Sequence, residues 1–292
     1  MSCVKEFLVK YNYEADAVTF LNDAYQVLQS NQKAFEIFSS CVAEYEQDIN
    51  FDHAGAFDKV HALSESTGIH KYTLELLFLI CLTPHLKELY AAEGIAEDIY
   101  DNTVCDLKWK AKECRDLYGV WGCFVGWWTI DFFKLNRFAI GRLQYNLRQL
   151  SHDISSNGMV LQKGLWFISV HIPSSGPLVH ADCQASYKQA AEFFRKRYHM
   201  NDIVFGCESW LMAPQNHEIL PAHSNILKFM SDYTIVEHRA PRDHSNVWRI
   251  FNVMELPDDL STLPEDTSLR RAFKAWLMKG NTIHIGFGVI FY

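Results

Sequence analysis

Two residues in the second half of the chain have types and positions suited to taking a proton from a reacting group. Glu208 lies inside the otherwise apolar segment IVFGCESWLM, residues 203–212, and burial there would raise the pKa of its carboxyl toward neutrality. His171 lies at the end of the apolar segment LWFISVHI, just before the loop sequence PSSGP, and an imidazole titrates near neutral pH. Structural roles stay open for both, since Glu208 could pair with an arginine or cap a backbone group and His171 could be held by a backbone carbonyl. The pattern therefore indicates two candidate general bases.

The cysteines and the remaining histidines offer weaker chemistry. The eight cysteines form no C-x-x-C pair, so we expect buried free thiols in a reducing cytoplasm and no metal site. A hydrolase that pairs Cys207 or Cys183 with His171 stays open as a further alternative. Four other histidines fit no common metal motif and are expected to be solvated, namely His217, His223, His238 and His244.

The charge and the apolar stretches of the chain argue against some classes of binding partner. The 292 residues include 27 Lys and Arg against 35 Asp and Glu, a formal net charge of −8, whereas a general nucleic-acid binder needs a basic face. The most apolar stretch, residues 74–82, is far shorter than the ~20 residues that a bilayer-spanning helix requires, so a buried helix is expected there. The N-terminus lacks the apolar core of a secretory signal. We therefore expect no nucleic acid, no membrane and a cytoplasmic location.

Helices dominate the first half of the sequence. Apolar residues recur at helical spacing over 15–45, 52–66, 72–92 and 95–118. Glycines at 68, 94 and 119 predict the ends of the last three helices, and Pro84 predicts a kink or break in the third. The aromatic segment 122–133 has no clean period, and we place it at the junction between two domains.

The second half mixes strands and helices. Strand patterns cover 143–147, 165–172, 203–212, 233–238, 247–253 and 282–292, helical patterns cover 225–232 and 264–279, and 155–158 reads as a hairpin turn. A further helix follows the PSSGP loop, with Asp182 as its expected N-cap. The apolar C-terminal strand could be central in a sheet or an edge that needs a partner.

Several segments of this second half carry a resemblance to a known family: GVWGCFVGWW, AIGRLQYNL, VHIPSSGPL with SYKQAAEFF, CESWLM and HSNILKF. Together they resemble a family of bacterial N-acyltransferases that pairs a helical N-terminal domain with a GNAT-like C-terminal domain. The HIPxxGPL and GRLQ motifs are the most specific parts. The resemblance implies an α+β fold, with a helical domain over residues 1–133 and a GNAT-like mixed α/β domain over residues 134–292.

The resemblance also implies acyl-CoA as co-substrate. In GNAT enzymes acyl-CoA lies where two strands splay apart, and backbone N–H groups of the following loop hold its pyrophosphate. The matching place here is the loop 173–178, which has one glycine and no adjacent basic residue, unlike the usual signature of Arg or Gln followed by two spaced glycines. That glycine can adopt a positive φ. The implied acyl-CoA contacts come from Ile172, Ser174, Ser175, Gly176 and Leu178.

For catalysis, the resemblance implies direct attack of a small-molecule amine on the thioester. Glu208 or His171 would assist removal of the amine proton. The leaving thiolate would take a proton from a tyrosine on the helix before the sixth strand of the GNAT fold, where Phe229 stands in this chain and Tyr233 follows at the helix end. Because the loop and tyrosine patterns depart from the usual ones, a second hypothesis stays open: a non-catalytic ligand-binding or interaction protein on a degenerate GNAT-like fold.

Overall fold

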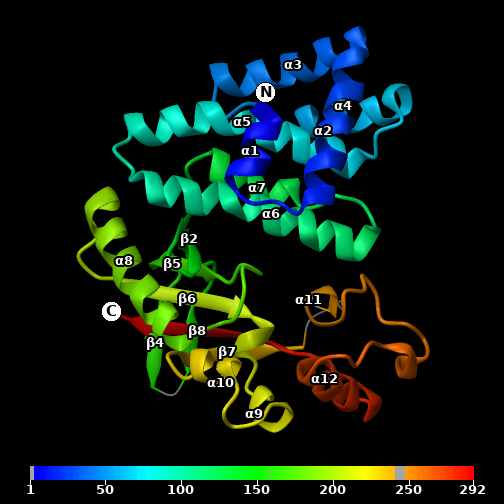
Figure 1. The fold of residues 1–292 in the computed structure, drawn as a ribbon. Helices are drawn as coiled ribbons and strands as arrows, with labels where there is room; N and C mark the ends of the chain where they lie inside the picture. Colours follow the sequence, from blue (N-terminus) through cyan, green and yellow to red (C-terminus); the bar gives the residue numbers. More distant parts are fainter. Residues whose placement is uncertain (1–2, 157, 241–246) are drawn as a thin grey trace. The chain divides into compact units, whose positions relative to one another are not determined.

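The computed structural model describes residues 3–156, 158–240 and 247–292. The chain divides into two compact units, and the division follows Ala139 (Figure 1). Helices build the first unit, and the second is built around a six-stranded sheet. The predicted α+β class, with a helical part followed by a mixed α/β part, is confirmed.

Seven helices form the described part of the first unit: α1 (Cys3–Lys10), α2 (Ala15–Ser30), α3 (Gln32–Gln47), α4 (His53–Thr67), α5 (Lys71–Ala92), α6 (Glu97–Tyr118) and α7 (Gly126–Phe133). Helix α5 contacts each of the other six, and it carries the most apolar stretch of the sequence. A helix that is apolar on all sides is stable only when it is surrounded, so the predicted buried helix is confirmed. Over the described residues, no helix combines the length and apolarity needed to cross a bilayer.

Two of these helices end at glycines as predicted, whereas one predicted helix is divided in two. Gly68 and Gly119 end α4 and α6 in the left-handed conformation, with φ of 70° and 73°, as predicted. The single helix expected over 15–45 is wrong, because Asn31 separates α2 from α3. The Asn31 side chain accepts a hydrogen bond from the Ala34 N–H at 3.2 Å and so caps the second helix. Pro84 lies inside α5 without ending it.

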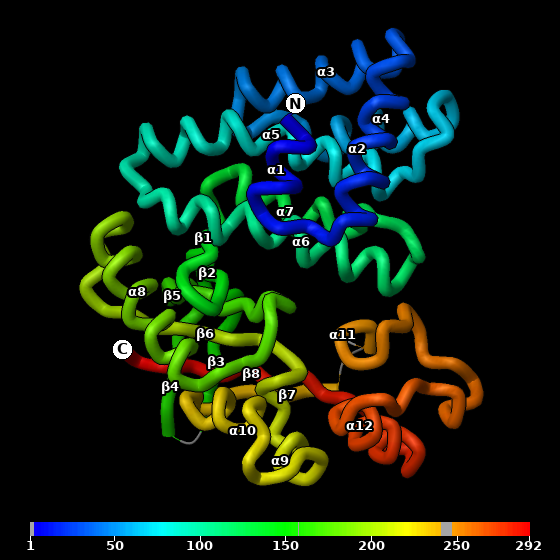
Figure 2. Tube along the Cα trace, in the orientation of Figure 1, coloured from blue at the N-terminus to red at the C-terminus, as the bar shows by residue number. Residues whose placement is uncertain are grey.

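Six strands form a sheet in the order β1-β2-β5-β6-β8-β7 (Figure 2), and the division after Ala139 falls within β1. β5 runs parallel to β6, whereas the pairs β2–β5, β6–β8 and β7–β8 are antiparallel. The apolar C-terminal strand β8 is therefore central, between β6 and β7, and is not an edge. The strands are β1 (Arg137–Ile140), β2 (Leu143–Gln149), β5 (Trp166–His171), β6 (Val204–Ser209), β7 (Thr234–Arg239) and β8 (Ile285–Phe291).

A separate hairpin joins β2 to β5. Its strands β3 (Ile154–Ser156) and β4 (Met159–Leu161) pair antiparallel, with Ser156 opposite Met159. The predicted hairpin is confirmed by this pairing, although Asn157 at its turn lies outside the described residues. Ile154 and Leu161 belong to one apolar cluster with residues of β5, β6, β7 and β8, so the hairpin packs on one face of the sheet.

The helices of the second unit correct three predictions. They are α8 (His180–Tyr198), α9 (Asn216–Ile219), α10 (Asn225–Met230), α11 (Val247–Phe251) and α12 (Ser268–Met278), with 3₁₀ turns at Trp210–Met212 and Leu260–Thr262. The strand predicted over 247–253 is wrong, because its buried residues Val247, Ile250 and Phe251 recur at helical spacing. The strand predicted over 203–212 ends at Ser209 and continues as a 3₁₀ turn.

The third correction concerns the start of α8. Asp182 lies in the first turn of this helix, and the N-cap is Val179, which makes no side-chain cap hydrogen bond. The carboxylate of Asp182 still lies near the positive end of the helix dipole. The helix therefore begins closer to the PSSGP loop than the capping pattern indicated.

Candidate active site

The sheet has two faces with different surroundings. Phe205 faces α8, since its ring lies 5.4 Å from that of Tyr187, centroid to centroid. Cys207 lies two residues further along β6 and shares this face, which we call the α8 face. Gly206 and Glu208 point the other way. A Cβ on Gly206 would meet the Phe167 and Phe287 rings, so these rings lie with Glu208 on what we call the Glu208 face.

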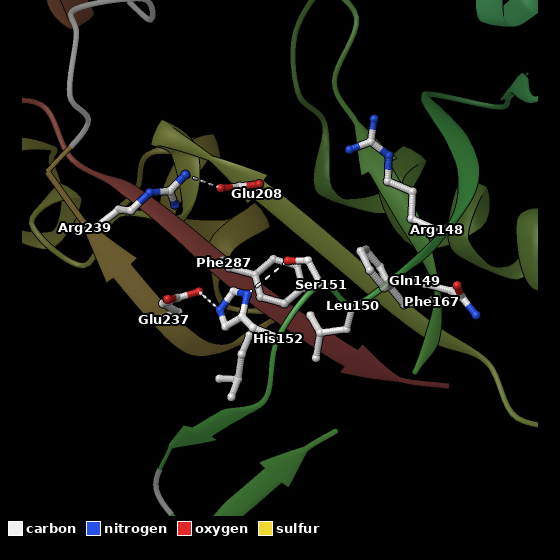
Figure 3. Close-up of a pocket in the computed structure, with 11 residues that line it drawn as sticks. Arg148, Gln149, Leu150, Ser151, His152, Phe167, Glu208, Glu237, Arg239 and Phe287 are labelled. Carbon is white, nitrogen blue, oxygen red and sulfur yellow. Dashed lines mark hydrogen bonds and ion pairs between the residues drawn. The ribbon is translucent and has the colours of Figure 1, made fainter. Parts of the chain in front are cut away.

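A pocket of about 450 Å³ lies on the Glu208 face (Figure 3). Its volume falls within the ~300–1,000 Å³ typical of small-molecule sites. Phe167 and Phe287 form an apolar floor, with ring centroids 5.7 Å apart. The polar residues that line the pocket are Arg148, Gln149, Ser151, His152, Glu208, Glu237 and Arg239. The pocket thus combines an apolar surface with groups of both charges.

Glu208 lines this pocket, but the prediction that it is buried is wrong. Its side chain is 51% exposed, and Arg239 Nη2 lies 2.7 Å from its Oε1. The apolar neighbours in IVFGCESWLM alternate between the two faces of the sheet, so they do not enclose Glu208. The pairing with an arginine, which stayed open from the sequence, is present.

His171 lies on the same face as Glu208, from the neighbouring strand. The β5–β6 ladder pairs Ile168 with Phe205 and Ser169 with Gly206, and His171 and Glu208 each lie two residues beyond the last pair. The His171 Nε2 is 2.6 Å from Asn146 Oδ1 on β2. The two candidate bases therefore flank the point where the ladder between the parallel strands ends, although His171 does not line the pocket.

Tyr233 lies on the α8 face and not in the pocket. A Cβ on Gly288 would meet the Tyr233 side chain, and Gly288 pairs with Cys207 in the sheet. The Tyr233 and Tyr187 hydroxyls are 3.0 Å apart. Burial raises the pKa of Tyr233 well above its ordinary value. The structure therefore does not bring Tyr233 together with Glu208, and its role as a proton donor stays a prediction.

The loop after β5 is organised by a residue distant in sequence. Arg142, in the turn between β1 and β2, donates to the backbone oxygens of residues 173, 176 and 177 at 3.2, 2.8 and 3.1 Å, and to Ser175 Oγ at 3.4 Å. Burial lowers the pKa of the Arg142 guanidinium from its ordinary value. The fold thus supplies the basic residue that the sequence lacks next to this loop.

The position of Arg142 is fixed by helix α8. Gly141, with φ of 62°, makes the β1–β2 turn. Ser186 of α8 accepts a hydrogen bond from the Leu143 N–H at 3.2 Å and donates to the Ile140 carbonyl. The sequence reasoning missed Arg142, although the GRLQ motif that contains it was already among the most specific parts of the resemblance.

The loop itself is open where the resemblance implies contacts. Ser174, Ser175 and Gly176 are exposed, whereas Ile172 and Leu178 are half-buried. Gly176 has a φ of 111°, and nothing lies within 4 Å of the place where a Cβ would stand. The expected positive φ of Gly176 is confirmed, and a ligand can approach the backbone there closely.

The cysteines and histidines were the other candidates for chemistry in the sequence. Cys207 and Cys183 are buried, and burial raises the pKa of Cys183 to about 11 and that of Cys207 further. Among the described residues, no three His, Cys, Asp or Glu side chains come together in a way that could hold a metal ion. His217, His223 and His238 are exposed, as expected, whereas His244 lies outside the described residues.

Comparison with known families decides the identity of this fold. Residues 137–290 match the GNAT-like C-terminal domain, and residues 4–135 match the N-acyltransferase N-terminal domain. The chain belongs to the GNAT-like C-terminal domain family. The resemblance to N-acyltransferases that join a helical N-terminal domain to a GNAT-like domain is thereby confirmed.

Solved structures share the architecture of this GNAT-like chain. One is a crystal structure of an acyltransferase in complex with decanoyl-CoA, with a TM-score of 0.72 and 20% identity, covering 98% of this chain and 86% of that chain. Another is an acyltransferase with decanoyl-CoA and teicoplanin, with a TM-score of 0.64 and 20% identity over 99% of both chains. At this identity the likeness shows the fold. Among proteins of curated function, none matches the sequence significantly.

Proposed function

We propose that this chain is an acyl-CoA-dependent N-acyltransferase in which an amine attacks the thioester directly. The observation that carries the proposal is the position of Glu208. This carboxylate lines a small-molecule pocket and lies just past the last paired residues of the parallel strands β5 and β6. Membership in the GNAT-like family supports acyl transfer as the chemistry at this position.

The loop 173–178 fits a CoA pyrophosphate. Arg142 binds three backbone oxygens of this loop, so those carbonyls turn toward the guanidinium and away from a ligand. The exposed backbone at Ser174 and Ser175 is then free to present N–H groups to an anion, and α8 begins directly after the loop. Bound acyl-CoA would supply the activated acyl group, while the loop and Arg142 hold and orient its anionic part.

Glu208 is the group that we assign to proton removal from the amine. Arg239 binds its Oε1, which orients the carboxylate and leaves the other oxygen for the substrate. A positioned base of this kind contributes about 10²–10⁴-fold to a reaction rate. His171 is the second candidate, since its ring is fixed by Asn146 on the same face.

The nature of the acyl group and of the acceptor is inferred from similar proteins and from the size of the pocket. Similar acyltransferases have been crystallised with decanoyl-CoA and with teicoplanin. By analogy, we infer that this chain accepts an acyl-CoA with a chain longer than acetyl. The acceptor would be a small-molecule amine, consistent with a pocket of about 450 Å³.

Thermal unfolding with CoA, acetyl-CoA, octanoyl-CoA and decanoyl-CoA tests the first step. A ligand at 100 times its Kd adds about 2.7 kcal/mol of stability, so we expect a clear rise in Tm with at least one acyl-CoA. Release of free CoA thiol in the presence of an amine panel then tests turnover. No rise in Tm with any acyl-CoA would contradict the proposal, and binding without thiol release would favour the non-catalytic alternative.

A further inference from the structure

Arg148 stands out among the charged side chains of the Glu208 pocket. It extends from β2 and lines the pocket wall (Figure 3). The other basic groups there are matched, since Arg239 pairs with Glu208 at 2.7 Å and His152 lies 3.4 Å from Glu237. Within residues 3–156, 158–240 and 247–292, Arg148 makes no ion pair. An unmatched guanidinium in a pocket is a ready partner for an anionic group on a ligand.

An apolar floor separates Arg148 from Glu208. Arg148 pairs with Phe167 in the β2–β5 ladder, and Glu208 pairs with Phe287 in the β6–β8 ladder. The two phenyl rings approach each other over Gly206, where any Cβ would collide with them. A ligand that spans the pocket therefore meets a cation, an apolar surface and a carboxylate in that order.

The sheet geometry sets the span of such a ligand. Arg148 is level with Phe167, and Glu208 lies two residues beyond the Ser169–Gly206 pair. That offset corresponds to about 13 Å along the strands and about 10 Å across two strand spacings. The two long side chains cover part of this distance. A ligand that bridges them must separate its amine and its anionic group by more than the single α-carbon of a free amino acid.

We propose that the acceptor carries a carboxylate as well as its amine, and that Arg148 binds this carboxylate while Glu208 receives the amine. The proposal rests on the proposed N-acyltransferase function and names the acceptor class. The chemistry best suited to the pocket is that of a short peptide with an apolar side chain, whose terminal amine and carboxylate are several bonds apart. Arg148 is then a specificity-determining residue.

Binding of matched dipeptides tests the proposal without requiring turnover. The probes are alanyl-phenylalanine and its C-terminal amide, which differ only in the carboxylate. Calorimetry on the full chain should show the free acid binding at least tenfold more tightly than the amide. In Arg148→Gln this difference should disappear, whereas Arg195→Gln, an exposed arginine of α8, should keep it.

Kinetics separate this proposal from the proposed function. With acyl-CoA saturating, Arg148→Gln should raise the KM for the free acid at least tenfold and leave the KM for the amide and for acyl-CoA unchanged. Carboxylate-dependent binding without any thiol release would support the acceptor site and contradict the transferase function. If neither dipeptide binds, or if Arg148→Gln keeps the same preference as the unaltered chain, the proposal is overturned.

Discussion

The two faces of the sheet in the second unit give adjacent residues of one strand opposite surroundings. Cys207 is fully buried on the α8 face, whereas the next residue, Glu208, is half exposed in the pocket. The alternation of a strand sends successive side chains to opposite faces. Strand β6 therefore contributes side chains both to the buried core and to the pocket. Whether a residue holds an odd or an even position along the strand decides which of the two its side chain enters.

The α8 face holds its polar groups in fixed hydrogen bonds. The Tyr145 hydroxyl lies 2.6 Å from Ser186 Oγ, and the Tyr187 and Tyr233 hydroxyls lie 3.0 Å apart. Burial raises the pKa of each of these three tyrosines. Protons on this face are costly to remove, because a charge there would be desolvated. The Glu208 face instead presents charged groups that remain accessible.

Replacement of Glu208 should give the largest effect and sharpen this comparison. In Glu208→Gln we expect kcat to fall by about 10²–10⁴-fold, because the amine loses its base. The stability should change little, since an exposed ion pair contributes about 0–1 kcal/mol. Steady-state thiol release and thermal unfolding of the same preparations measure both quantities.

Glu192→Gln provides the matched control for that variant. Glu192 is an exposed carboxylate on α8, away from the pocket, and its replacement should leave kcat unchanged. An unaltered kcat in Glu208→Gln would show that Glu208 is not the base that takes the amine proton, and His171 would then be the remaining candidate.

Loss of Arg142 should have an intermediate effect. In Arg142→Gln the loop 173–178 loses the donor that binds its backbone oxygens at 2.8–3.2 Å. We expect the Kd for CoA to rise about tenfold, equivalent to about 1.4 kcal/mol, with kcat at saturating acyl-CoA nearly unchanged. Calorimetric titration with CoA measures the Kd, with Arg195→Gln as the control. A Kd equal to that of the unaltered chain would show that the loop does not hold CoA.

On the α8 face, removal of the Tyr233 hydroxyl should affect stability more than rate. Tyr233→Phe leaves the Tyr187 hydroxyl without its partner at 3.0 Å, which costs about 1–2 kcal/mol. We expect a fall in Tm of a few degrees and a kcat within tenfold of the original. A loss of more than 100-fold in kcat, with the Tm preserved, would instead identify Tyr233 as the acid that protonates the leaving thiolate.

The sequence predicted the fold better than the site, and particular residues explain the difference. Helix ends at Gly68 and Gly119 depend on local backbone chemistry, and the β2 and β5 patterns depend on burial, so all were readable from short segments. The exposure of Glu208 could not be predicted from its apolar neighbours, because these alternate between the two faces of the sheet and do not enclose it. Arg142 reaches the loop because Ser186 holds the β1–β2 turn in place through two hydrogen bonds. The residues that make these contacts are distant in sequence, so no local pattern predicts that Arg142 binds the loop.

Alkylation should have the smallest effect on activity and tests whether the α8 face holds a reactive thiol. The hydrogen bond with Cys81 lowers the pKa of Cys3 to about 6, whereas burial raises the pKa of Cys183 to about 11. Above pH 6 Cys3 is therefore mostly thiolate and its labelling rate should already level off near neutral pH, while Cys183 and Cys207 stay protonated. We expect iodoacetamide to modify Cys3 first, as mass spectrometry would show, with thiol release from acyl-CoA unchanged. Loss of activity in proportion to the modification of Cys207 or Cys183 would support the alternative of a cysteine hydrolase. It would also contradict the view that the α8 face is structural and that the Glu208 face carries the chemistry.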